Sequence, residues 1–150
     1  MDVFLQDVKK KQLNLVLKLD HQIVVPSFIK KIAKYMFKNC EMLTKIEFEK
    51  DSQLRLIDDC SFCGTKIKKY LIPSHVIKIG RFAFSGCNNL KEIEFADYYE
   101  LQVIDEFAFS GLQIECFTIP SNITEIREYA FQHSYFLSID FAQKSELRKN

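Results

Sequence analysis

Tryptophan is absent from this chain of 150 residues, and only four glycines and three prolines occur. With so few glycines, the sequence contains no glycine-rich loop of the kind that holds phosphate groups. The net charge is only +1, so no broad electrostatic field favours nucleic acid or an anionic membrane as a partner. No apolar stretch reaches the roughly 20 residues that a transmembrane helix requires.

The N-terminal segment is not expected to be a secretory signal peptide. Asp2 and Asp7 lie within it, and lysines interrupt its apolar residues. The five cysteines are an odd number, and we expect them to be free thiols, which suits a reducing compartment. Both features favour a cytoplasmic location.

The three prolines are spaced at equal intervals of 47 residues. They stand at Pro26, Pro73 and Pro120, and each follows a β-branched residue and precedes a serine. Because proline restricts the backbone locally, three in phase indicate that one backbone segment is built three times. The sequence therefore predicts a stacked repeat array, whose function is to be sought on its surfaces rather than in a catalytic centre.

One pattern of apolar residues occurs twice within each interval between prolines. An aliphatic residue is followed three positions later by isoleucine, and five positions after that by phenylalanine. The five instances are Ile29-Ile32-Phe37, Leu54-Ile57-Phe62, Val76-Ile79-Phe84, Leu101-Ile104-Phe109 and Ile123-Ile126-Phe131. The phenylalanines are 25, 22, 25 and 22 residues apart, so longer and shorter coils of a solenoid alternate.

A turn and then a strand are predicted after each of these phenylalanines. Two positions beyond it stands glycine or a residue that tolerates positive φ, which indicates a left-handed turn closing a short helical segment. These residues are Asn39, Gly64, Gly86, Gly111 and His133. The strand follows with apolar residues at regular positions, as in Ile114-x-x-Phe117-x-Ile119. In the last coil we align Leu137, Ile139 and Phe141 with this pattern, which implies that one residue is lost between the first two.

The template divides the chain into a cap and an array. Residues 1–22 match it poorly and are predicted to form a degenerate N-terminal cap, whereas residues 23–150 are predicted to form the array. Near the C-terminus Ser145-Glu146-Leu147 restarts the template, so either a further coil is missing or an unpaired sheet edge remains. The array is divided into about five coils, at 29–53, 54–75, 76–100, 101–122 and 123–146, the last of them incomplete.

The longer coil resembles the BspA-type leucine-rich repeat. The resemblance rests on the run from Pro73 to Phe95, which reads Pro-Ser-x-Val-x-x-Ile-Gly-x-x-Ala-Phe-x-x-Cys-x-x-Leu-x-x-Ile-x-Phe. The shorter coil, residues 101–120, is similar to the partner that alternates with this repeat, an arrangement most like that of the protozoan members. The resemblance covers about residues 23–147. It implies a repeat solenoid, mainly β with short helical turns: a right-handed leucine-rich-repeat coil with a parallel sheet on the concave face.

The cysteines are expected to be structural. Cys40 and Cys87 both stand three residues after the repeat phenylalanine, which predicts small buried core residues. Cys60-x-x-Cys63 has the spacing of a zinc knuckle or a thiol redox site, but no second cysteine pair or ordered histidines accompany it. Cys116 is expected to be an exposed thiol. We therefore expect no metal and no cofactor, and a thiol redox enzyme is only a remote alternative.

The outward side of the predicted strands is the candidate binding face. In a parallel sheet, outward side chains of neighbouring coils lie about 4.8 Å apart and form ladders. One interpretation is a solvated surface with weak ion pairs, and the other is a broad surface that docks a macromolecule. The first ladder is Lys45, Lys69, Glu92, Cys116 and Ser138, and the second is Glu47, Leu71, Glu94, Thr118 and Asp140.

Two functions are weighed beside the redox alternative. Members of the family that the chain resembles are typically surface proteins of bacteria and of mucosal protozoan parasites. The resemblance thus implies a protein-binding module acting in surface adhesion or as a host-interaction antigen. An intracellular scaffold is the alternative, favoured by the free thiols and the N-terminal composition. The partner is expected to be a protein. Asn122-Ile-Thr124 matches the N-glycosylation acceptor pattern, which matters only if the chain is secreted.

Overall fold

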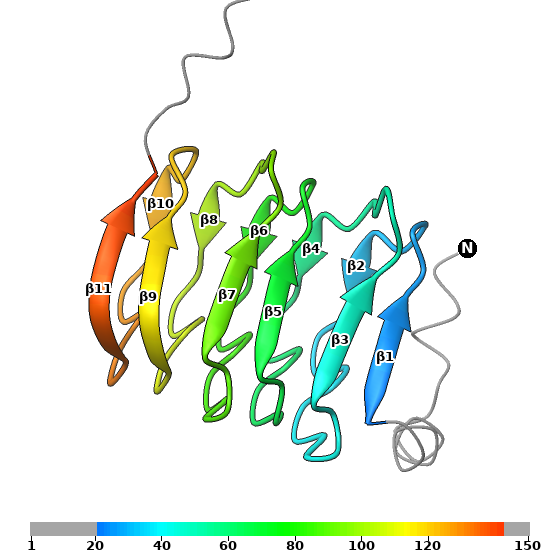
Figure 1. Cartoon of the computed structure of the whole chain (residues 1–150), viewed down its shortest axis with the longest axis horizontal. Coiled ribbons are helices and arrows are strands. Elements are labelled where there is room, and N and C mark those ends of the chain that lie inside the picture. Colours follow the sequence, from blue (N-terminus) through cyan, green and yellow to red (C-terminus); the bar gives the residue numbers. More distant parts are fainter. Residues whose placement is uncertain (1–20, 143–150) are drawn as a thin grey trace, which may run out of the picture.

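The structure, a computed structural model, describes residues 21–142. These residues form a β-solenoid with two rows of strands, and strands of successive coils pair in parallel (Figure 1). The short strands are β2 (Lys31–Ile32), β4 (Leu56–Ile57), β6 (Lys78–Ile79), β8 (Val103–Ile104) and β10 (Glu125–Ile126). The long strands are β1 (Gln22–Val25), β3 (Lys45–Phe48), β5 (Lys69–Ile72), β7 (Glu92–Phe95), β9 (Gln113–Ile119) and β11 (Tyr135–Phe141). The predicted parallel solenoid is confirmed.

The short strands form one continuous sheet in the order β10-β8-β6-β4-β2. Its register aligns the isoleucines that the repeat places three residues after each coil begins. Of this row, Ile32, Ile57, Ile79 and Ile104 are fully buried, whereas Ile126 in the last strand is 43% exposed. Ile126 is therefore the one isoleucine of this row that the described residues leave partly uncovered.

The long strands pair only in twos: β1 with β3, β5 with β7, and β9 with β11 (Figure 1). Between β3 and β5, backbone hydrogen bonds occur only where the strands begin. The N–H of Lys66 donates to the carbonyl of Leu43 at 3.1 Å, and that of Lys68 to Thr44 at 3.3 Å. Within the described residues, no ladder of strand hydrogen bonds joins β3 to β5 or β7 to β9. The long-strand side is thus a row of three strand pairs rather than one continuous sheet.

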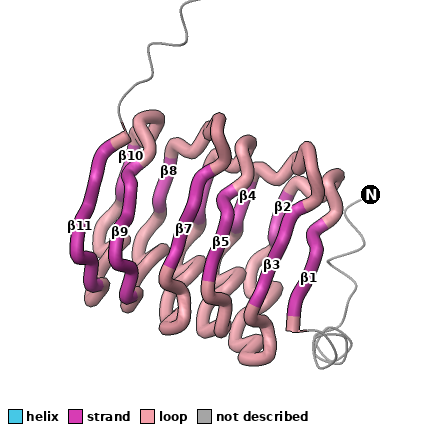
Figure 2. Tube along the Cα trace, viewed as in Figure 1, coloured by secondary structure: helices cyan, strands magenta, loops and turns pink. Residues whose placement is uncertain are grey.

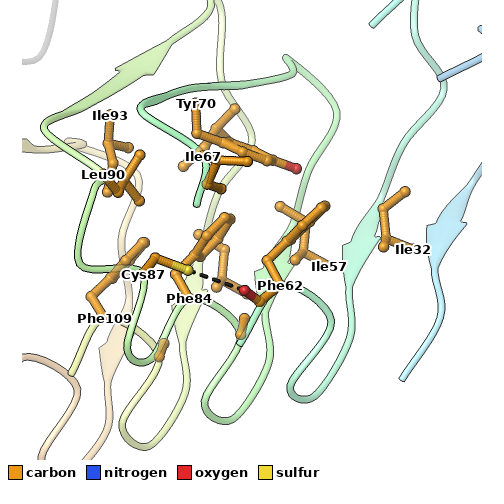
Figure 3. Packing of buried hydrophobic residues seen from close by; sticks show 14 of the residues in the cluster. Ile32, Ile57, Phe62, Ile67, Tyr70, Phe84, Cys87, Leu90, Ile93 and Phe109 are labelled. Carbon is orange, nitrogen blue, oxygen red and sulfur yellow. Dashed lines mark hydrogen bonds between the residues drawn. The ribbon is translucent and has the colours of Figure 1, made fainter. Parts of the chain in front are cut away.

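The repeat phenylalanines form a single stacked row through the core, as Figure 3 shows for its central part. From Phe37 to Phe131, successive ring centroids lie 5.1, 5.3, 5.4 and 5.6 Å apart, and the ring planes differ by no more than 13°. Isoleucines and leucines fill the space between this row and the strands. The expected stacking of successive coils on their apolar sides is therefore present.

Turns, and not short helices, connect the short strands to the long strands in the described residues (Figure 2). The predicted positive φ at Asn39, Gly64, Gly86, Gly111 and His133 is confirmed, with values between 56° and 76°. A second row, two residues before each repeat phenylalanine, also has positive φ: Tyr35, Cys60, Phe82, Phe107 and Tyr129. Because each turn contains two residues with positive φ, four positions apart, no helical turn propagates, and the prediction of short helical segments is wrong in this detail.

Hydrogen bonds between coils explain this unusual backbone. In the turns around Phe37, Phe62, Phe84 and Phe109, alternate N–H groups donate to carbonyls of the following coil, as from Phe62 to Ala83 at 2.9 Å and from Gly64 to Ser85 at 3.0 Å. Bulky residues at positive φ are strained. Stacking of Phe82 on Phe107, with centroids 4.7 Å apart, offsets part of that strain.

The alignment of the last strand from sequence is wrong by one residue at its start. In β11 the residue opposite Ile114 is Phe136, not Leu137, while Ile139 and Phe141 lie opposite Phe117 and Ile119 as expected. The spacing within the strand is therefore intact, and the missing residue belongs to the turn that precedes it. Phe136 packs against Phe131 and Phe117, which fixes this register.

Tyr70 is the largest fully buried side chain. It occupies the core position that Ile46 and Ile93 hold in neighbouring coils, and its ring lies 4.7 Å from that of Phe84 (Figure 3). No described residue provides a hydrogen-bond partner for its hydroxyl. Burial raises the pKa of Tyr70 well above its ordinary value of 10.0, so the hydroxyl stays neutral.

Replacement of Tyr70 by phenylalanine is expected to raise the free energy of unfolding by about 1 kcal/mol, because it removes an unsatisfied buried hydroxyl. Denaturant-induced unfolding followed by circular dichroism measures this change. Tyr98→Phe is the matched control, because Tyr98 is 84% exposed and its hydroxyl is solvated. A loss of stability in Tyr70→Phe would contradict the prediction.

Two predictions lie wholly or mostly outside the described residues. The proposed cap, residues 1–22, is described only from His21 onward. The restart of the template at Ser145-Glu146-Leu147 lies beyond Ala142. The described part of the chain contains no helix long and apolar enough to cross a lipid bilayer.

Candidate protein-binding face

The outward side chains of the long strands form the surface that we call the long-strand face. Within strand pairs, the register places the predicted ladder residues opposite one another: Lys69 opposite Glu92 and Leu71 opposite Glu94. In the last pair, Cys116 lies opposite Ser138 and Thr118 opposite Asp140. The expected continuous ladders are interrupted between β3 and β5 and between β7 and β9, since those strands do not pair.

Two members of this face were missed from the sequence. Gln22 lies opposite Lys45 and Val24 opposite Glu47, because β1 pairs with β3 in the same register as later strands. Gln22 falls within the predicted cap, and the residues before Pro26 do not show the full template. The sequence does contain a signal for them. Val25 precedes Pro26 as Ile72 precedes Pro73, so the residues before Val25 could have been aligned with the strand that ends at Ile72.

Ion pairs tie the charged side chains of the face to one another. The Nζ atom of Lys69 lies 2.6 Å from Oε1 of Glu94 and 3.1 Å from Oε2 of Glu92. Lys45 and Glu47 are paired at 2.6 Å. The hydrogen bonds that Lys69 donates to Glu94 and then to Glu92 raise the pKa of Lys69 above its ordinary value. All these groups are about half exposed, so the pairs contribute little to stability and remain available to a partner.

A groove of about 410 Å³ lies across β1, β3, β5 and β7, where the long strands stop pairing. We call it the face groove. Two exposed apolar residues border it, Val24 at 53% and Leu71 at 43% exposure. The charged residues around it are Lys45, Glu47, Lys69 and Glu94. It thus gathers five of the ten residues predicted for the binding face.

A second groove, of about 350 Å³, lies between β7 and β9. Glu94 and Thr118 border it, together with Tyr99 and Pro120. The remaining predicted residues, Glu92, Cys116, Ser138 and Asp140, border neither of these two grooves. Both grooves lie at interruptions in strand pairing, which sequence patterns do not reveal.

Cys60, Cys63, Cys87 and Cys116 carry free thiols in the described structure. Cys40 and Cys87 are buried as expected, and the Cys87 thiol donates to the carbonyl of Phe62 at 3.1 Å (Figure 3). Burial raises the pKa of Cys87 to about 11. Burial likewise raises the pKa of Cys60, the first cysteine of the Cys60-x-x-Cys63 motif. Redox catalysis requires an accessible thiolate, so these environments give the enzyme alternative no support.

Cys116 and Asn122 are the two further residues singled out for modification chemistry. Cys116 is exposed, and its Sγ atom lies 3.4 Å from Oδ2 of Asp140 on the neighbouring strand. The side-chain amide of Asn122 donates to the carbonyl of Tyr99 at 2.6 Å. Glycosylation of Asn122 in the folded chain would have to break that contact.

A buried carboxylate was missed from the sequence. The side chain of Asp105 is only 3% exposed and lies 2.6 Å from Lys78 and 3.2 Å from Arg127. Asp58, one 47-residue period earlier, pairs with Lys31 at 2.6 Å. Burial opposes ionisation of Asp105, but the hydrogen bonds from Lys78 and the backbone of Glu106, with the charge of Lys78, lower its pKa. In the sequence, Lys31 and Lys78 are 47 residues apart, as are Asp58 and Asp105, and this shared spacing could have indicated the two ion pairs.

Metal ligands do not gather anywhere in the described residues: no group of three histidine, cysteine, aspartate or glutamate side chains is placed to hold an ion. The carboxylates described above instead face lysine and arginine. The arrangement of residues 21–142 is therefore that of a surface with grooves and ion pairs.

The sequence matches the BspA-type leucine-rich repeat region over residues 17–141, in six copies. Among solved structures, the pneumococcal vaccine antigen PcpA is similar, with 30% identity, a TM-score of 0.79 and coverage of 82% of this chain. The chain spans only 31% of the PcpA chain. No curated protein matches the sequence.

Two further structures share the fold. A leucine-rich repeat protein from Bacteroides capillosus has 21% identity and a TM-score of 0.56, covering 83% of this chain and 78% of that one. A leucine-rich cell surface protein from Faecalibacterium prausnitzii has 21% identity and a TM-score of 0.53, covering 75% of this chain and 36% of that one. The sequence match includes every described strand from β1 to β11. The chain belongs to the BspA-type leucine-rich repeat family.

Proposed function

We propose that this chain is a non-enzymatic module that binds a partner protein on its long-strand face. The face groove carries the proposal, because it combines exposed apolar side chains with a rim of charged residues. Protein interfaces use such an apolar centre for contact and a polar rim for orientation. The stacked coils support the groove from below, so the face is preorganised for docking.

We place this binding at a cell surface, in adhesion or in contact with a host. Two similar structures support this step: one is of a vaccine antigen and another is of a leucine-rich cell surface protein. An intracellular scaffold is the second candidate, supported by the free thiols of Cys60, Cys63, Cys87 and Cys116. Labelling of intact cells with a membrane-impermeant reagent separates the two, since only a surface protein becomes labelled.

Exchange of the charges at Lys69 and Glu92 is expected to weaken binding about tenfold, because it reverses the pattern that a partner meets on the face. The double variant Lys69→Glu with Glu92→Lys keeps an ion pair between β5 and β7, so the fold is retained. A partner is first captured on the immobilised protein and identified. Its affinity for the wild-type chain and the variant is then measured by titration calorimetry.

Arg81 and Glu106 provide the matched control, because they form an exposed ion pair at 2.8 Å in the turns, outside the long strands. The exchange Arg81→Glu with Glu106→Arg is expected to leave the affinity unchanged. Equal affinity of the wild-type chain and the Lys69–Glu92 exchange would argue against the long-strand face as the binding surface.

A further inference from the structure

The last described coil leaves an apolar surface at the C-terminal end of the array. Ile104 and Phe117, which point inward in the preceding coil, are at most 1% exposed. Their counterparts one coil later are Ile126, 43% exposed, and Ile139, 49% exposed. Phe141, at the end of β11, is 74% exposed. These side chains have the residue types of a core but lack the covering coil that buries their counterparts.

A groove of about 370 Å³ lies on this end surface, and we call it the terminal groove. The large apolar side chains of its lining are those of Ile119, Pro120, Ile123, Ile126 and Phe141. Ser121, Thr124 and Glu125 add polar groups. Ala142, the last described residue, also lines the groove, so the chain enters residues 143–150 from its rim.

The sequence of residues 143–150 continues the repeat in phase. Leu54 stands six residues after Phe48 at the end of β3, and Leu101 stands six residues after Phe95 at the end of β7. Both leucines are fully buried against the preceding coil. Leu147 stands six residues after Phe141 at the end of β11. The one-residue shortening before β11 therefore leaves the spacing that follows it unchanged.

Two backbone ladders end at the terminal groove. The first ladder involves the residue that directly follows the aliphatic residue opening each coil, such as Arg55 after Leu54. Its N–H donates to the carbonyl of the equivalent residue in the preceding coil, always at 2.9 Å. The rungs are Arg55 to Lys30, Ile77 to Arg55, Gln102 to Ile77 and Thr124 to Gln102. In the second, Gln53 donates to Ser27 at 2.7 Å and Glu100 to Ser74 at 2.9 Å. The next acceptors are the carbonyls of Thr124 and Ser121, and the residues in phase to donate are Arg148 and Glu146.

We propose that residues 143–150 occupy the terminal groove as the first limb of a further coil, with Leu147 seated on Ile123. The N–H groups of Glu146 and Arg148 then extend the two backbone ladders by one rung each. Because this segment is tethered at the groove rim, its effective concentration there is far higher than that of a second copy of the chain. The end surface is thus a seat for the chain's own continuation.

Amide hydrogen exchange measured by NMR on the full 150-residue chain tests the proposal. The amides of Glu146 and Arg148 are expected to exchange at least about tenfold more slowly than in a free peptide of residues 143–150. Leu147→Ala is expected to bring both rates close to those of the peptide. Leu137→Ala is the matched control, because Leu137 is 69% exposed on β11 and its truncation leaves the terminal groove intact.

The protection is expected to be the same across about a hundredfold range of protein concentration, as intramolecular docking requires. Peptide-like exchange at Glu146 and Arg148 in the wild-type chain would overturn the proposal. Protection that appears only as the concentration rises would also overturn it, since a second copy would then be the occupant. A melting transition shared by both variants and the wild type shows that the array itself stays folded.

Discussion

Replacement of Phe84 by alanine is expected to lower the free energy of unfolding by roughly 3–5 kcal/mol, the cost of truncating a buried phenylalanine. Phe84 lies in the middle of the stacked row, with ring centroids 5.3 Å from Phe62 and 5.4 Å from Phe109. The ring of Tyr70 lies at 73° to that of Phe84, with the two centroids 4.7 Å apart. The cavity left by truncation therefore opens against three aromatic rings, and coils on both sides lose contacts. Unfolding in denaturant, followed by circular dichroism, measures the loss.

Phe28→Ala is the matched control for this truncation. Phe28 is 59% exposed, so the same chemical change is expected to alter stability by no more than about 0.5 kcal/mol. If the two variants unfold at the same denaturant concentration, the stacked row does not stabilise the array.

Replacement of Asp105 by asparagine is expected to lower the free energy of unfolding by about 1.5–3 kcal/mol, the range for hydrogen bonds to charged groups. The change keeps the shape of the side chain but removes the charge that faces Lys78 and Arg127. Because only 3% of the side chain is exposed, water cannot replace these contacts. Asp97→Asn is the control, since Asp97 lies on the surface.

The effect of Asp105→Asn is also expected to depend on pH. The pKa of Asp105 is lowered from its ordinary value of 3.8. Such a carboxyl stabilises the folded chain above its unfolded pKa, and this contribution is lost as the pH falls through the folded pKa. The difference in stability between wild type and variant is expected to be full near neutral pH and to shrink below about pH 4. Asp58 is present in both the wild type and the variant, so its contribution to stability cancels in the difference. A difference that stays constant in acid would contradict this account.

Much of the architecture could be predicted from the sequence because one physical constraint repeats in it. Each coil must present phenylalanine and isoleucine to the next, so Phe37, Phe62, Phe84 and Phe109 mark the core without reference to coordinates. Glycine or asparagine at the turn positions follows from the need for positive φ. The same reasoning missed Tyr35 and its equivalents, because bulky residues at positive φ contradict local preference and are held there by bonds between coils.

The errors arose where the pattern is ambiguous or where tertiary contacts decide. Tyr135, Phe136 and Leu137 are all apolar, so the start of the last strand was not defined by hydrophobicity; packing of Phe136 on Phe131 decides it. The ten predicted face residues could be named from alternation along the strands. The grooves could not, because they arise where strands stop pairing, and a repeat that looks uniform gives no sign of that. Binding by this face stays a prediction.

The interruptions of the long-strand sheet coincide with the two Lys–Asp pairs that are 47 residues apart. The ion pair of Asp58 with Lys31 links the coil that contains β3 to the coil that contains β5. The ion pair of Asp105 with Lys78 likewise links the coils that contain β7 and β9. On the long-strand side, paired and unpaired junctions thus alternate, whereas the short strands pair at every junction, so the smallest unit that repeats is a doublet of coils. Gene duplication or deletion in whole doublets keeps every junction matched, whereas gain or loss of a single coil would set two unlike edges against each other.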